Sequence, residues 1–502
     1  MHRHPLWLGL VALGIAGGVS ARAAEKTQID RIVSEGREDS RVMEHLDYLT
    51  NRFGPRLTGS DNLRNTEEWA RDRFRSFGID NARLERWGEF PVGYTRGPSS
   101  GRMVEPEARA LSFGTNAWTA GTKGVVRGRA VLAPANEEQL AGARERLRGA
   151  WVFVPSAGRR PSAADAEFRK TLDAAYAEAG IAGLVRPTRG ELILTGGDYR
   201  VSWEKLPQTP AINLLQAQFD EIADRLRRGQ EVVLEFDIRN YFRPGPVPLR
   251  NVVADIPGTE FPDEYVIVGG HLDSWDGATG TTDNGTGCAT TLEAARILMH
   301  AGVWPRRSIR FMLWSGEEQG LLGSRAYIKA HPELMEMISA VLVHDGGTNY
   351  LSGLGVTQAM RQDMDEALAP LLGLDAAMPF ALRDVPGLRP GGSDHDSFLR
   401  AGVPGFFWGQ SGRADYRRTH HTQFDTYDAA VPAYQRHSAL VVALAAFGIA
   451  ELDHRLPRQG LVAPSNRRVV GVQLDDLTIV EVLPESVAAA AGLRPGDVIV
   501  RV

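Results

Sequence analysis

This chain of 502 residues lacks several features that would restrict its class. It has a single cysteine, Cys288, so no internal disulfide can form, and we expect this thiol to be a small buried hydrophobe rather than a nucleophile. Beyond its first residues it has no apolar run long enough to cross a bilayer. It also has no basic run with interleaved aromatic residues, which disfavours nucleic-acid binding. With 43% hydrophobic residues, the chain can instead build cores for two or three domains.

The first residues predict export. The start MHRHP carries positive charge, Leu6 to Val19 is apolar, and Ala21-Arg22-Ala23 gives the small-x-small pattern of a cleavage site. We therefore expect residues 1–23 to be a signal peptide that is cleaved near Ala23, with a periplasmic or secreted mature protein. A permanent N-terminal anchor is the alternative. The mature protein should have no stable membrane span.

Residue types that bind metal ions occur in five fragments in the middle of the chain. An HxD triplet or an EE doublet alone is more typical of a solvated loop or a helix face. Here, however, the fragments follow short apolar runs, and a parallel sheet brings the loops after its strands to one edge. The fragments contain His271 and Asp273 in GGHLDSWDG, Asp283 in TTDNGTG, Glu317 and Glu318 in LWSGEEQGLLGS, Asp345 in LVHDGGTN, and His421 in HHTQFDT.

The apolar runs predict an α/β fold with a mostly parallel mixed sheet and helices on both faces. They are short, rich in β-branched and aromatic residues, and apolar at alternating positions on both sides, as expected for central strands. A helical pattern lies between them, at Leu292 to Leu298, and a long apolar stretch from Ala439 to Leu452 closes the region. The strand-like runs are 265–268, 309–314, 340–343 and 403–407.

Zinc chemistry accounts for these residue types. Imidazoles and carboxylates are the usual ligands of hydrolytic zinc, and two ions about 3.5–4 Å apart need a bridging carboxylate. Asp283 is the candidate bridge, and Asp273 is a candidate for orienting the imidazole of His271 without binding metal. In the doublet one carboxylate can bind metal, which leaves Glu317 as a general base toward water.

These motifs resemble those of the cocatalytic zinc aminopeptidases and their carboxypeptidase Q-like relatives. The segments HLDSWDGATGTTDNGTG and WSGEEQGLLGS and the HxxxDT pattern of His421 to Thr426 occur in that family's order, and the similarity extends from Phe53 to about residue 455 around an insertion. The resemblance implies two Zn²⁺ ions per chain and a cis peptide bond after Asp283. One ion would be held by His271, Asp283 and Asp345, and the other by Asp283, Glu318 and His421.

The resemblance also concerns two neighbouring groups, His420 and the segment around His395. The spacing to Asp-Thr selects His421 as the ligand, so His420 is interpreted as its neighbour. The segment GGSDHDSF resembles a loop that lies over the substrate, where His395 could polarise the scissile carbonyl; alternatively this segment starts a helix with Ser393 as its N-cap. Apart from the resemblance, Tyr416, Arg417 and Arg418 stand just before His421 and could bind a substrate carboxylate, although arginine pairs in loops are more often solvated.

Helix-capping residues and glycine- or proline-rich stretches predict a discontinuous peptidase domain, 24–114 and 243–455. Asp30 to Leu49 is expected to be helical, and Ser60 is expected to cap a second helix that ends at Gly78. Residues 115–242 alternate strand and helix patterns and resemble a protease-associated domain, which would be either a lid that limits substrate size or a passive insertion. The proline-rich stretch 242–248 is interpreted as the hinge back to the first domain.

The C-terminal residues 467–502, after a linker at 456–466, resemble part of a PDZ domain. They contain the Ala-Gly-Leu-x-Pro-Gly-Asp turn from Ala491 to Asp497. The second helix and last strand of such a domain are absent from this sequence, so we do not expect the usual peptide groove.

The sequence thus favours a secreted two-zinc exopeptidase in which a water activated between the metal ions attacks a terminal peptide bond. An aminopeptidase is the favoured activity, and a carboxypeptidase Q-like dipeptidase is the alternative. A non-catalytic binding ectodomain is the alternative of another class, and a single-zinc cyclase on the same fold is disfavoured because His271 and Asp345 are both present. The expected partners are peptides or dipeptides, and a homodimer stays open.

Overall fold

The structure is a computed structural model that describes residues 28–156, 163–461, 470–475, 477–483 and 486–500. The predicted signal peptide and its cleavage site lie outside these ranges. The described chain divides into two compact units, the first ending at Leu461 and the second comprising the residues that follow it. No helix within the described ranges combines the length and the apolar character that a membrane span requires.

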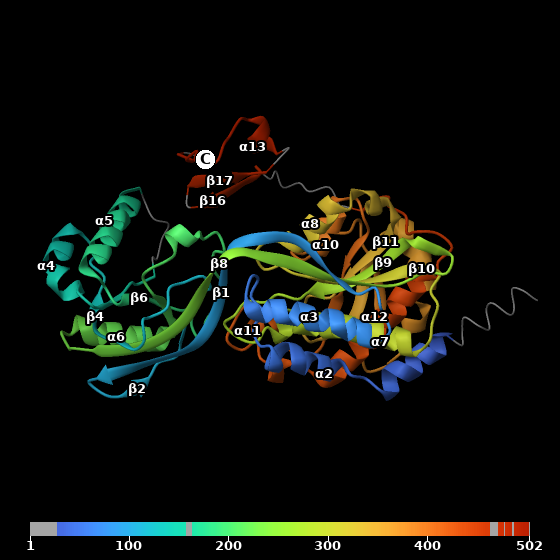
Figure 1. Ribbon diagram of the computed structural model, residues 1–502, viewed down its shortest axis with the longest axis horizontal. Helices are drawn as coiled ribbons and strands as arrows, with labels where there is room; N and C mark the ends of the chain where they lie inside the picture. The colour runs from blue at the N-terminus through green and yellow to red at the C-terminus, as the bar shows by residue number, and fades with distance from the viewer. Residues whose placement is uncertain (1–27, 157–162, 462–469, 476, 484–485, 501–502) are drawn as a thin grey trace, which may run out of the picture. The chain divides into compact units, whose positions relative to one another are not determined.

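The centre of the first unit is a mixed sheet covered by helices, which confirms the predicted mixed α/β class. Four neighbouring strands run parallel in the order β14-β11-β9-β10, and β8 pairs antiparallel with β10. Figure 1 shows β9, β10 and β11 side by side with α12 and α7 against them. The bounds are β8 Val233–Ile256, β9 Phe261–His271, β10 Arg307–Trp314, β11 Ile338–Val343 and β14 Gly405–Phe407.

Alternating residues of these strands bury two different faces. On β10, Phe311 and Leu313 belong to the larger core, whereas Met312 and Trp314 belong to a second core. The larger core also contains the apolar sides of α2 (Val42–Asp47), α3 (Asp61–Ser76), α7 (Thr286–His300) and α12 (Pro432–Ala450). The second core contains residues of α8 (Leu322–Ala330) and α10 (His395–Arg400). Because side chains alternate along a strand, a run that is apolar on both sides must be covered on both sides.

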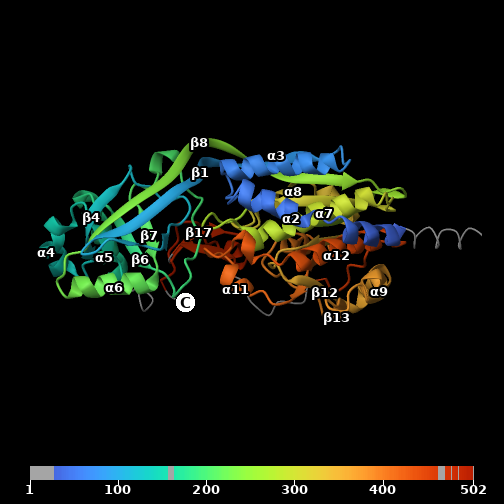
Figure 2. The same ribbon diagram turned by 90° about the horizontal axis from the view of Figure 1, so that it is seen from below.

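Helices α7 and α12 lie next to each other on the larger-core face, as Figure 2 also shows. Cys288, at the start of α7, is fully buried, and burial raises the pKa of its thiol to about 12. A thiol with such a pKa is protonated at neutral pH, in agreement with its expected role as a small hydrophobe.

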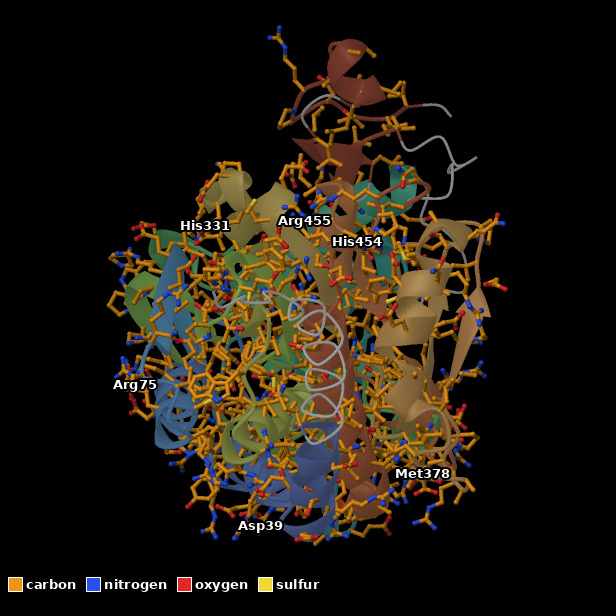
Figure 3. All side chains as sticks on the ribbon, turned by 90° about the vertical axis from the view of Figure 1, so that its right-hand side faces the viewer. Asp39, Arg75, His331, Met378, His454 and Arg455 are labelled. Carbon is orange, nitrogen blue, oxygen red and sulfur yellow. The ribbon has the colours of Figure 1, made fainter. Side chains whose placement is uncertain are left out.

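Polar and charged side chains surround this apolar centre. Figure 3 shows Asp39, Arg75, His331 and His454 on the outside of the molecule. The Arg75 side chain donates to the carbonyl of Ala82 at 3.0 Å, so part of this charged shell also fixes loops.

The N-terminal helices differ in part from the prediction. Instead of one helix over Asp30 to Leu49, residues 28–38 are helical, and α2 and a π-helical turn (Tyr48–Arg52) follow after a break. Helix α3 begins and ends as predicted, with Ser60 Oγ accepting from the backbone amide of Leu63 at 3.1 Å and Gly78 at a φ of 94°. This positive φ suits glycine, which has no Cβ.

Replacing the cap should therefore cost stability without touching the site. We expect Ser60→Ala to lower the free energy of unfolding by about 1 kcal/mol, because the amide of Leu63 loses its acceptor. Denaturant unfolding of the two proteins measures this difference. The exposed Ser34→Ala, outside α3, is the control and should leave the unfolding midpoint unchanged, since its hydroxyl bonds only an exposed glutamate four residues on.

The region predicted as an insertion has its own core. Strands β4 (Val126–Leu132), β5 (Trp151–Phe153), β6 (Gly183–Pro187) and β7 (Ala211–Leu214) neighbour one another in that order, and β4 pairs with the first part of β8. Trp151, Phe153 and Phe236 lie in this core with α6 (Gln216–Arg227). A further core lies under α4 (Glu137–Leu147) and α5 (Ala163–Ala179).

The proline-rich stretch 242–248 is not a hinge. It lies within β8, which pairs antiparallel with β1 (Arg83–Glu105) over most of its length, so that Phe242 faces Tyr94 and Val247 faces Phe90. Prolines occur in strands at edges and bulges, and the register shifts between Phe90 and Val92. The two regions are therefore joined by a paired ribbon, β1 and β8, which Figure 1 shows running between them.

Smaller elements complete the first unit. Strand β12 pairs with β13 and β15 in a separate three-stranded sheet. Leu456 and Leu461, predicted as linker, are buried in the larger core instead. The remaining bounds are β2 Arg109–Ala110, β3 Phe113–Gly114, β12 Tyr350–Val356, β13 Ala381–Asp384, β15 Gly409–Ser411, α9 Arg361–Ala367 and α11 Tyr416–Thr419.

The second unit is a hairpin with a short helix. Strand β16 (Val472–Asp475) pairs antiparallel with β17 (Thr478–Val482), and α13 (Val487–Ala490) is capped by Ser486. In the turn that follows, the backbone amide of Arg494 donates to Asp497 Oδ2 at 2.8 Å. The PDZ-like interpretation of this segment stays a prediction.

Candidate metal centre

The predicted metal-binding side chains meet at the carboxyl ends of the parallel strands. His271 is the last residue of β9, the Glu317-Glu318 doublet follows the end of β10, and Asp345 follows the end of β11. Asp283 lies in a kinked turn just before α7. These loops converge because parallel strands end at one sheet edge.

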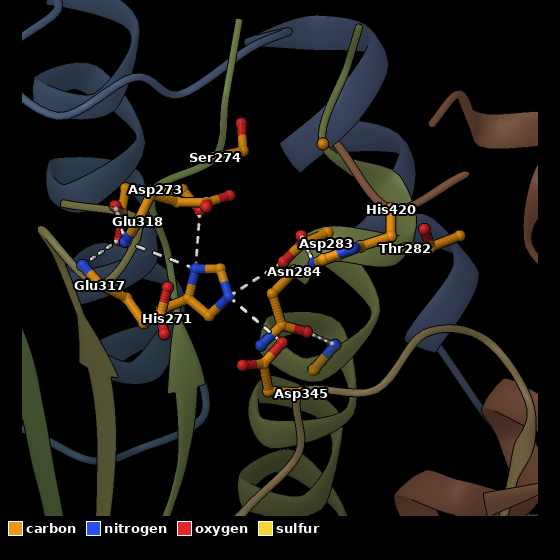
Figure 4. Close-up of polar contacts among 12 residues, drawn as sticks. His271, Asp273, Ser274, Thr282, Asp283, Asn284, Glu317, Glu318, Asp345 and His420 are labelled. Atoms are coloured by element: carbon orange, nitrogen blue, oxygen red, sulfur yellow. Dashed lines mark hydrogen bonds and ion pairs between the residues drawn. The ribbon is translucent and has the colours of Figure 1, made fainter. Parts of the chain in front are cut away.

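One cluster surrounds the imidazole of His271. Its Nε2 lies 3.1 Å from Asp283 Oδ1 and 3.3 Å from Asp345 Oδ1. In Figure 4 this imidazole lies between Asp273 and the pair formed by Asp283 and Asp345. His271 is buried to 1% exposure, so these polar atoms face one another and not the solvent.

A second cluster surrounds the imidazole of His421. Its Nε2 lies 3.1 Å from Asp283 Oδ2 and 3.0 Å from Glu318 Oε2. Asp283 therefore presents one carboxylate oxygen to each histidine. Of the five residues predicted to bind metal, Asp283 is the one that the two clusters share.

The donor set fits a pair of zinc ions. Ligand atoms held at 2.0–2.2 Å around a tetrahedral ion lie about 3.3–3.6 Å apart, close to the separations within both clusters. Each cluster contributes one imidazole nitrogen and two carboxylate oxygens, which leaves a fourth position open, as in catalytic zinc sites. The second oxygen of Glu318 has no hydrogen-bond partner although it is buried. His271, Asp283 and Asp345 also lie close enough together to share one ion.

The charges of the protein groups influence one another strongly. Although burial alone lowers it, hydrogen bonds to Asp283 and Glu318 raise the pKa of His421 to about 10. Burial, together with the neighbouring carboxylate of Asp283, raises the pKa of Glu318 to about 7. Burial also raises the pKa of Glu317 well above its ordinary value. Such perturbed groups at a sheet edge are typical of functional sites.

Asp273 contacts both His271 and the Glu317-Glu318 doublet. The Nδ1 atom of His271 lies 3.0 Å from the backbone carbonyl oxygen of Asp273, whereas the carboxylate is 3.7 Å away. The carboxylate instead accepts from the backbone amides of Glu317 and Glu318, both at 3.3 Å, and from Thr58 Oγ1 at 2.9 Å. The carbonyl of Asp273 thus favours one tautomer of His271, and its carboxylate holds the backbone of Glu317 and Glu318 in place.

Arg56 holds the same loops in place through hydrogen bonds to their backbone carbonyls. This fully buried guanidinium donates to the carbonyls of Leu272 and Gly280, both at 2.7 Å, and to the carbonyl of Thr279 at 2.9 Å. A buried arginine whose N–H groups are bonded to backbone carbonyls fixes the loop geometry, because breaking any of these hydrogen bonds would leave a buried polar group without a partner.

Asp425 is a site residue that the sequence reasoning did not single out. Its carboxylate accepts from the backbone amide of Thr282 at 2.5 Å, from the hydroxyl of Thr282 at 2.8 Å and from the amide of Asp283 at 3.2 Å. Burial raises the pKa of Asp425 to about 7. The sequence feature that could have revealed Asp425 is its place in the HxxxDT pattern, four positions after the candidate ligand His421.

Removing this carboxylate should disturb Asp283 without removing a ligand. We expect Asp425→Ala to weaken metal affinity about 10–100-fold, the range found for groups that orient ligands. A competition titration of the apoprotein with zinc and a fluorescent chelator measures it. Asp428→Ala, an exposed carboxylate three residues on, should leave the affinity at the wild-type value.

His420 and the two arginines before it lie next to the second cluster in the sequence. His420 stacks on His421 with ring centroids 3.9 Å apart, and its Nε2 is 3.6 Å from Asp283 Oδ2. His420 thus lies beside the second cluster, farther from Asp283 than His421 is. Arg418 lies over the ring of Phe424 at 4.0 Å, and Arg417 is exposed. Neither arginine therefore contributes to the two clusters of candidate metal ligands.

His395 starts helix α10 and is buried. The predicted N-cap bond of Ser393 is absent from this described segment, because the backbone carbonyl of Ser393, and not its hydroxyl, accepts from the amide of Asp396 at 2.9 Å. The carboxylate of Asp396 instead binds the amides of Gly391 and Gly392 at 2.8 and 3.1 Å. Burial lowers the pKa of His395, which favours the neutral imidazole.

The peptide bond between Asp283 and Asn284 is cis, as the family resemblance implied. Asn284 is held on both sides, since its Nδ2 donates to the carbonyl of His344 at 2.8 Å and its Oδ1 accepts from the amide of Gly287 at 3.0 Å.

In sequence and fold the chain is similar to zinc-dependent peptidases. Residues 251–446 match the model of Peptidase family M28. Carboxypeptidase Q from Rattus norvegicus is 28% identical over 430 residues, which cover 84% of this chain and 88% of the relative.

Two solved structures share the fold. The Peptidase M28 precursor from Shewanella amazonensis has a TM-score of 0.62 at 24% identity and covers 86% of this chain and 98% of its own. BSAP, a zinc aminopeptidase from Bacillus subtilis, has a TM-score of 0.52 at 17% identity and covers 81% of this chain and 93% of its own. The larger part of the chain therefore has counterparts in peptidases.

Proposed function

We propose that this protein is a two-zinc exopeptidase that hydrolyses terminal peptide bonds. The observation that supports it most directly is the shared carboxylate of Asp283, whose two oxygens lie 3.1 Å from His271 Nε2 and 3.1 Å from His421 Nε2. A carboxylate between two ligand clusters is what a pair of hydrolytic ions requires.

In this proposal each residue has a defined task. His271, Asp283 and Asp345 would hold one zinc ion, and Asp283, Glu318 and His421 would hold the other. When bound, the ions supply Lewis acidity that polarises the scissile carbonyl and acidifies the attacking water.

The remaining steps belong to the side chains of the protein. Glu317 takes a proton from the attacking water and passes it to the leaving amine. Asp273 keeps the backbone of Glu317 in place through its 3.3 Å hydrogen bond. His395 would donate a hydrogen bond to the carbonyl oxygen as negative charge develops there.

The two candidate activities differ in which end of the substrate is recognised. An aminopeptidase, the activity favoured by the sequence, trims longer peptides from a free amino end. A carboxypeptidase Q-like dipeptidase is favoured by the likeness to carboxypeptidase Q along 84% of the chain. If residues 1–23 are a signal peptide, both activities would act on peptides in the periplasm or outside the cell. A non-catalytic ectodomain is disfavoured because all five candidate ligands are brought together.

Purified zinc-loaded protein tests these alternatives with dipeptides, longer peptides and their N-acetylated forms. Stepwise release of amino acids from longer free peptides supports the aminopeptidase, and release from free dipeptides alone supports the dipeptidase. Either activity should disappear when the metal is removed with a chelator and return when zinc is added. A zinc-loaded protein that releases no amino acid from any of these peptides would refute the proposed function.

A further inference from the structure

The two histidines of the metal centre are held in different ways. His271 ends strand β9 in the middle of the sheet, and its side chain is 1% exposed. His421 lies in a turn, and its side chain is 33% exposed. Its φ of 56° is uncommon for a residue other than glycine. The sheet therefore positions His271, whereas the position of His421 depends on the groups that hold this turn.

A segment of the predicted insertion contacts the turn. The backbone amide of Thr195 donates to the carbonyl of His421 at 2.8 Å. Beside this hydrogen bond, Leu194 pairs antiparallel with Thr422, the next residue of the turn. Residues 191–195 lie far before the turn in the sequence, so the contact joins two distant parts of the chain.

The side chain of Gln423 fastens the same segment at two further points. Its Oε1 accepts from the amide of Ile193 at 2.8 Å, and its Nε2 donates to the carbonyl of Glu191 at 2.8 Å. Residues 191–195 are thus joined to residues 421–423 by both backbone and side-chain hydrogen bonds. Releasing the segment would leave several backbone groups without partners in the protein, which favours the joined arrangement.

The segment also packs against the loop that follows His271. A Cβ atom built on Gly277 would lie 1.6 Å from Thr195 Cγ2 and 2.9 Å from Thr195 Cβ, so an alanine at this position would displace one of the two segments. Trp275 in the same loop lies edge-on to the ring of His421, with ring centroids 6.3 Å apart. The loop after the first histidine therefore contacts both residues 191–195 and the second histidine.

We propose that residues 191–195 belong to the metal centre, where they hold the backbone of His421 in the conformation that binds the second zinc ion. The inference rests on the two-zinc site of the proposed function and adds Thr195 and Gln423 to it as positioning residues. This role differs from that of a lid and from that of a passive insertion, because it acts on metal affinity and needs no substrate.

The role has a reciprocal consequence. If the joined segment raises the affinity for zinc, then bound zinc must stabilise the joined segment by the same factor. The inference can therefore be tested from both sides, by changing the segment and measuring zinc affinity, and by adding zinc and observing the segment.

Zinc titrations of the full chain, in competition with a fluorescent chelator, separate the two ions. In the Asp345→Ala chain only the second cluster is complete, and in the His421→Ala chain only the first is. We expect Gln423→Ala to weaken zinc binding about tenfold in the Asp345→Ala chain, the lower end of the range for groups that orient ligands. In the His421→Ala chain the same substitution should change nothing, since the ligand that it positions is already absent.

A second pair of variants tests the contact through the size of the side chains. Gly277→Ala should displace Thr195 and lower the zinc affinity of the Asp345→Ala chain. Adding Thr195→Gly removes the two obstructing carbon atoms but keeps the amide that binds His421, so it should restore most of the affinity. A loss that Thr195→Gly does not recover would contradict the proposal.

Gln218→Ala in the Asp345→Ala chain is the matched control. The Gln218 side chain also accepts from one backbone amide, that of Ser112 at 2.8 Å, and donates to one backbone carbonyl, that of Ala110 at 3.3 Å, but it joins other segments. Zinc affinity should be the same with and without this substitution. A loss as large as that caused by Gln423→Ala would mean that general loosening is responsible, and it would overturn the proposal.

Amide hydrogen exchange tests the reciprocal effect and does not depend on activity. Adding zinc to the metal-free wild type should slow exchange at the amides of Ile193 and Thr195, whose acceptors belong to residues 421–423. Exchange at the amide of Ser112 should not change. The proposal would be overturned by unchanged exchange at Ile193 and Thr195, or by an equal effect of Gln423→Ala on the two clusters.

These measurements also separate the inference from the proposed function. Slower exchange with zinc and a loss of affinity confined to the second cluster support the inference even if no peptide is hydrolysed, a result that would refute the exopeptidase. A wild-type protein that binds fewer than two zinc ions would overturn both.

Discussion

Glu317→Gln is expected to reduce kcat by about 10²–10⁴-fold, the usual contribution of a general base, while zinc content stays at the wild-type value. The amide cannot accept a proton, but it is almost the same size as the carboxylate. The backbone amide of Glu317 can still donate to Asp273 Oδ1, so the loop should keep its position. Steady-state hydrolysis of a dipeptide and metal analysis of the same preparation measure the two quantities.

The neighbouring residue supplies the contrasting variant. Glu318 Oε2 lies 3.0 Å from His421 Nε2, so Glu318→Gln should lower zinc content as well as activity. Glu333→Gln, at a side chain that is 66% exposed, is the control and should change neither quantity. If Glu317→Gln lost zinc and Glu318→Gln kept it, the roles within the doublet would be the reverse of those proposed.

Asp283→Ala is expected to have the second large effect, namely the loss of both zinc ions from one substitution. Its two carboxylate oxygens face different histidines, so its removal takes one ligand from each cluster. Removing this ligand also leaves the buried imidazole of His271 and the partly exposed imidazole of His421 without their shared partner. Metal analysis after exhaustive dialysis should give well under one zinc ion per chain, and hydrolysis should fall to the background rate.

Asp345→Ala tests whether the sharing is specific to Asp283. The carboxylate of Asp345 lies 3.3 Å from His271 Nε2 and belongs to the first cluster alone. We therefore expect this variant to lose one ion and to retain about one, with the remaining ion held by Asp283, Glu318 and His421. Equal zinc contents in Asp345→Ala and Asp283→Ala would contradict the bridging role of Asp283.

Much of the central sheet was predictable from local patterns. The run 309–314 predicted a strand buried on both faces, and β10 has that burial because its alternating residues enter two cores. The cap at Ser60 was predictable as well, since the signal lies within four residues. Where the prediction was wrong, at the proline-rich stretch 242–248, the pairing of β8 with the distant β1 overrode the local tendency of proline and glycine to break a strand.

The sequence by itself determined the types of residue at the site and their order along the chain, because ligand chemistry and the ends of buried strands are both local properties. Only the tertiary structure decided that Asp283 presents one oxygen to each histidine, that Asp425 holds its backbone, and that Thr195 lies against His421. Each of these joins segments that are far apart in the sequence. Neither periodicity nor spacing encodes such a contact, since it arises only when separately folded loops are brought to the same edge of the sheet.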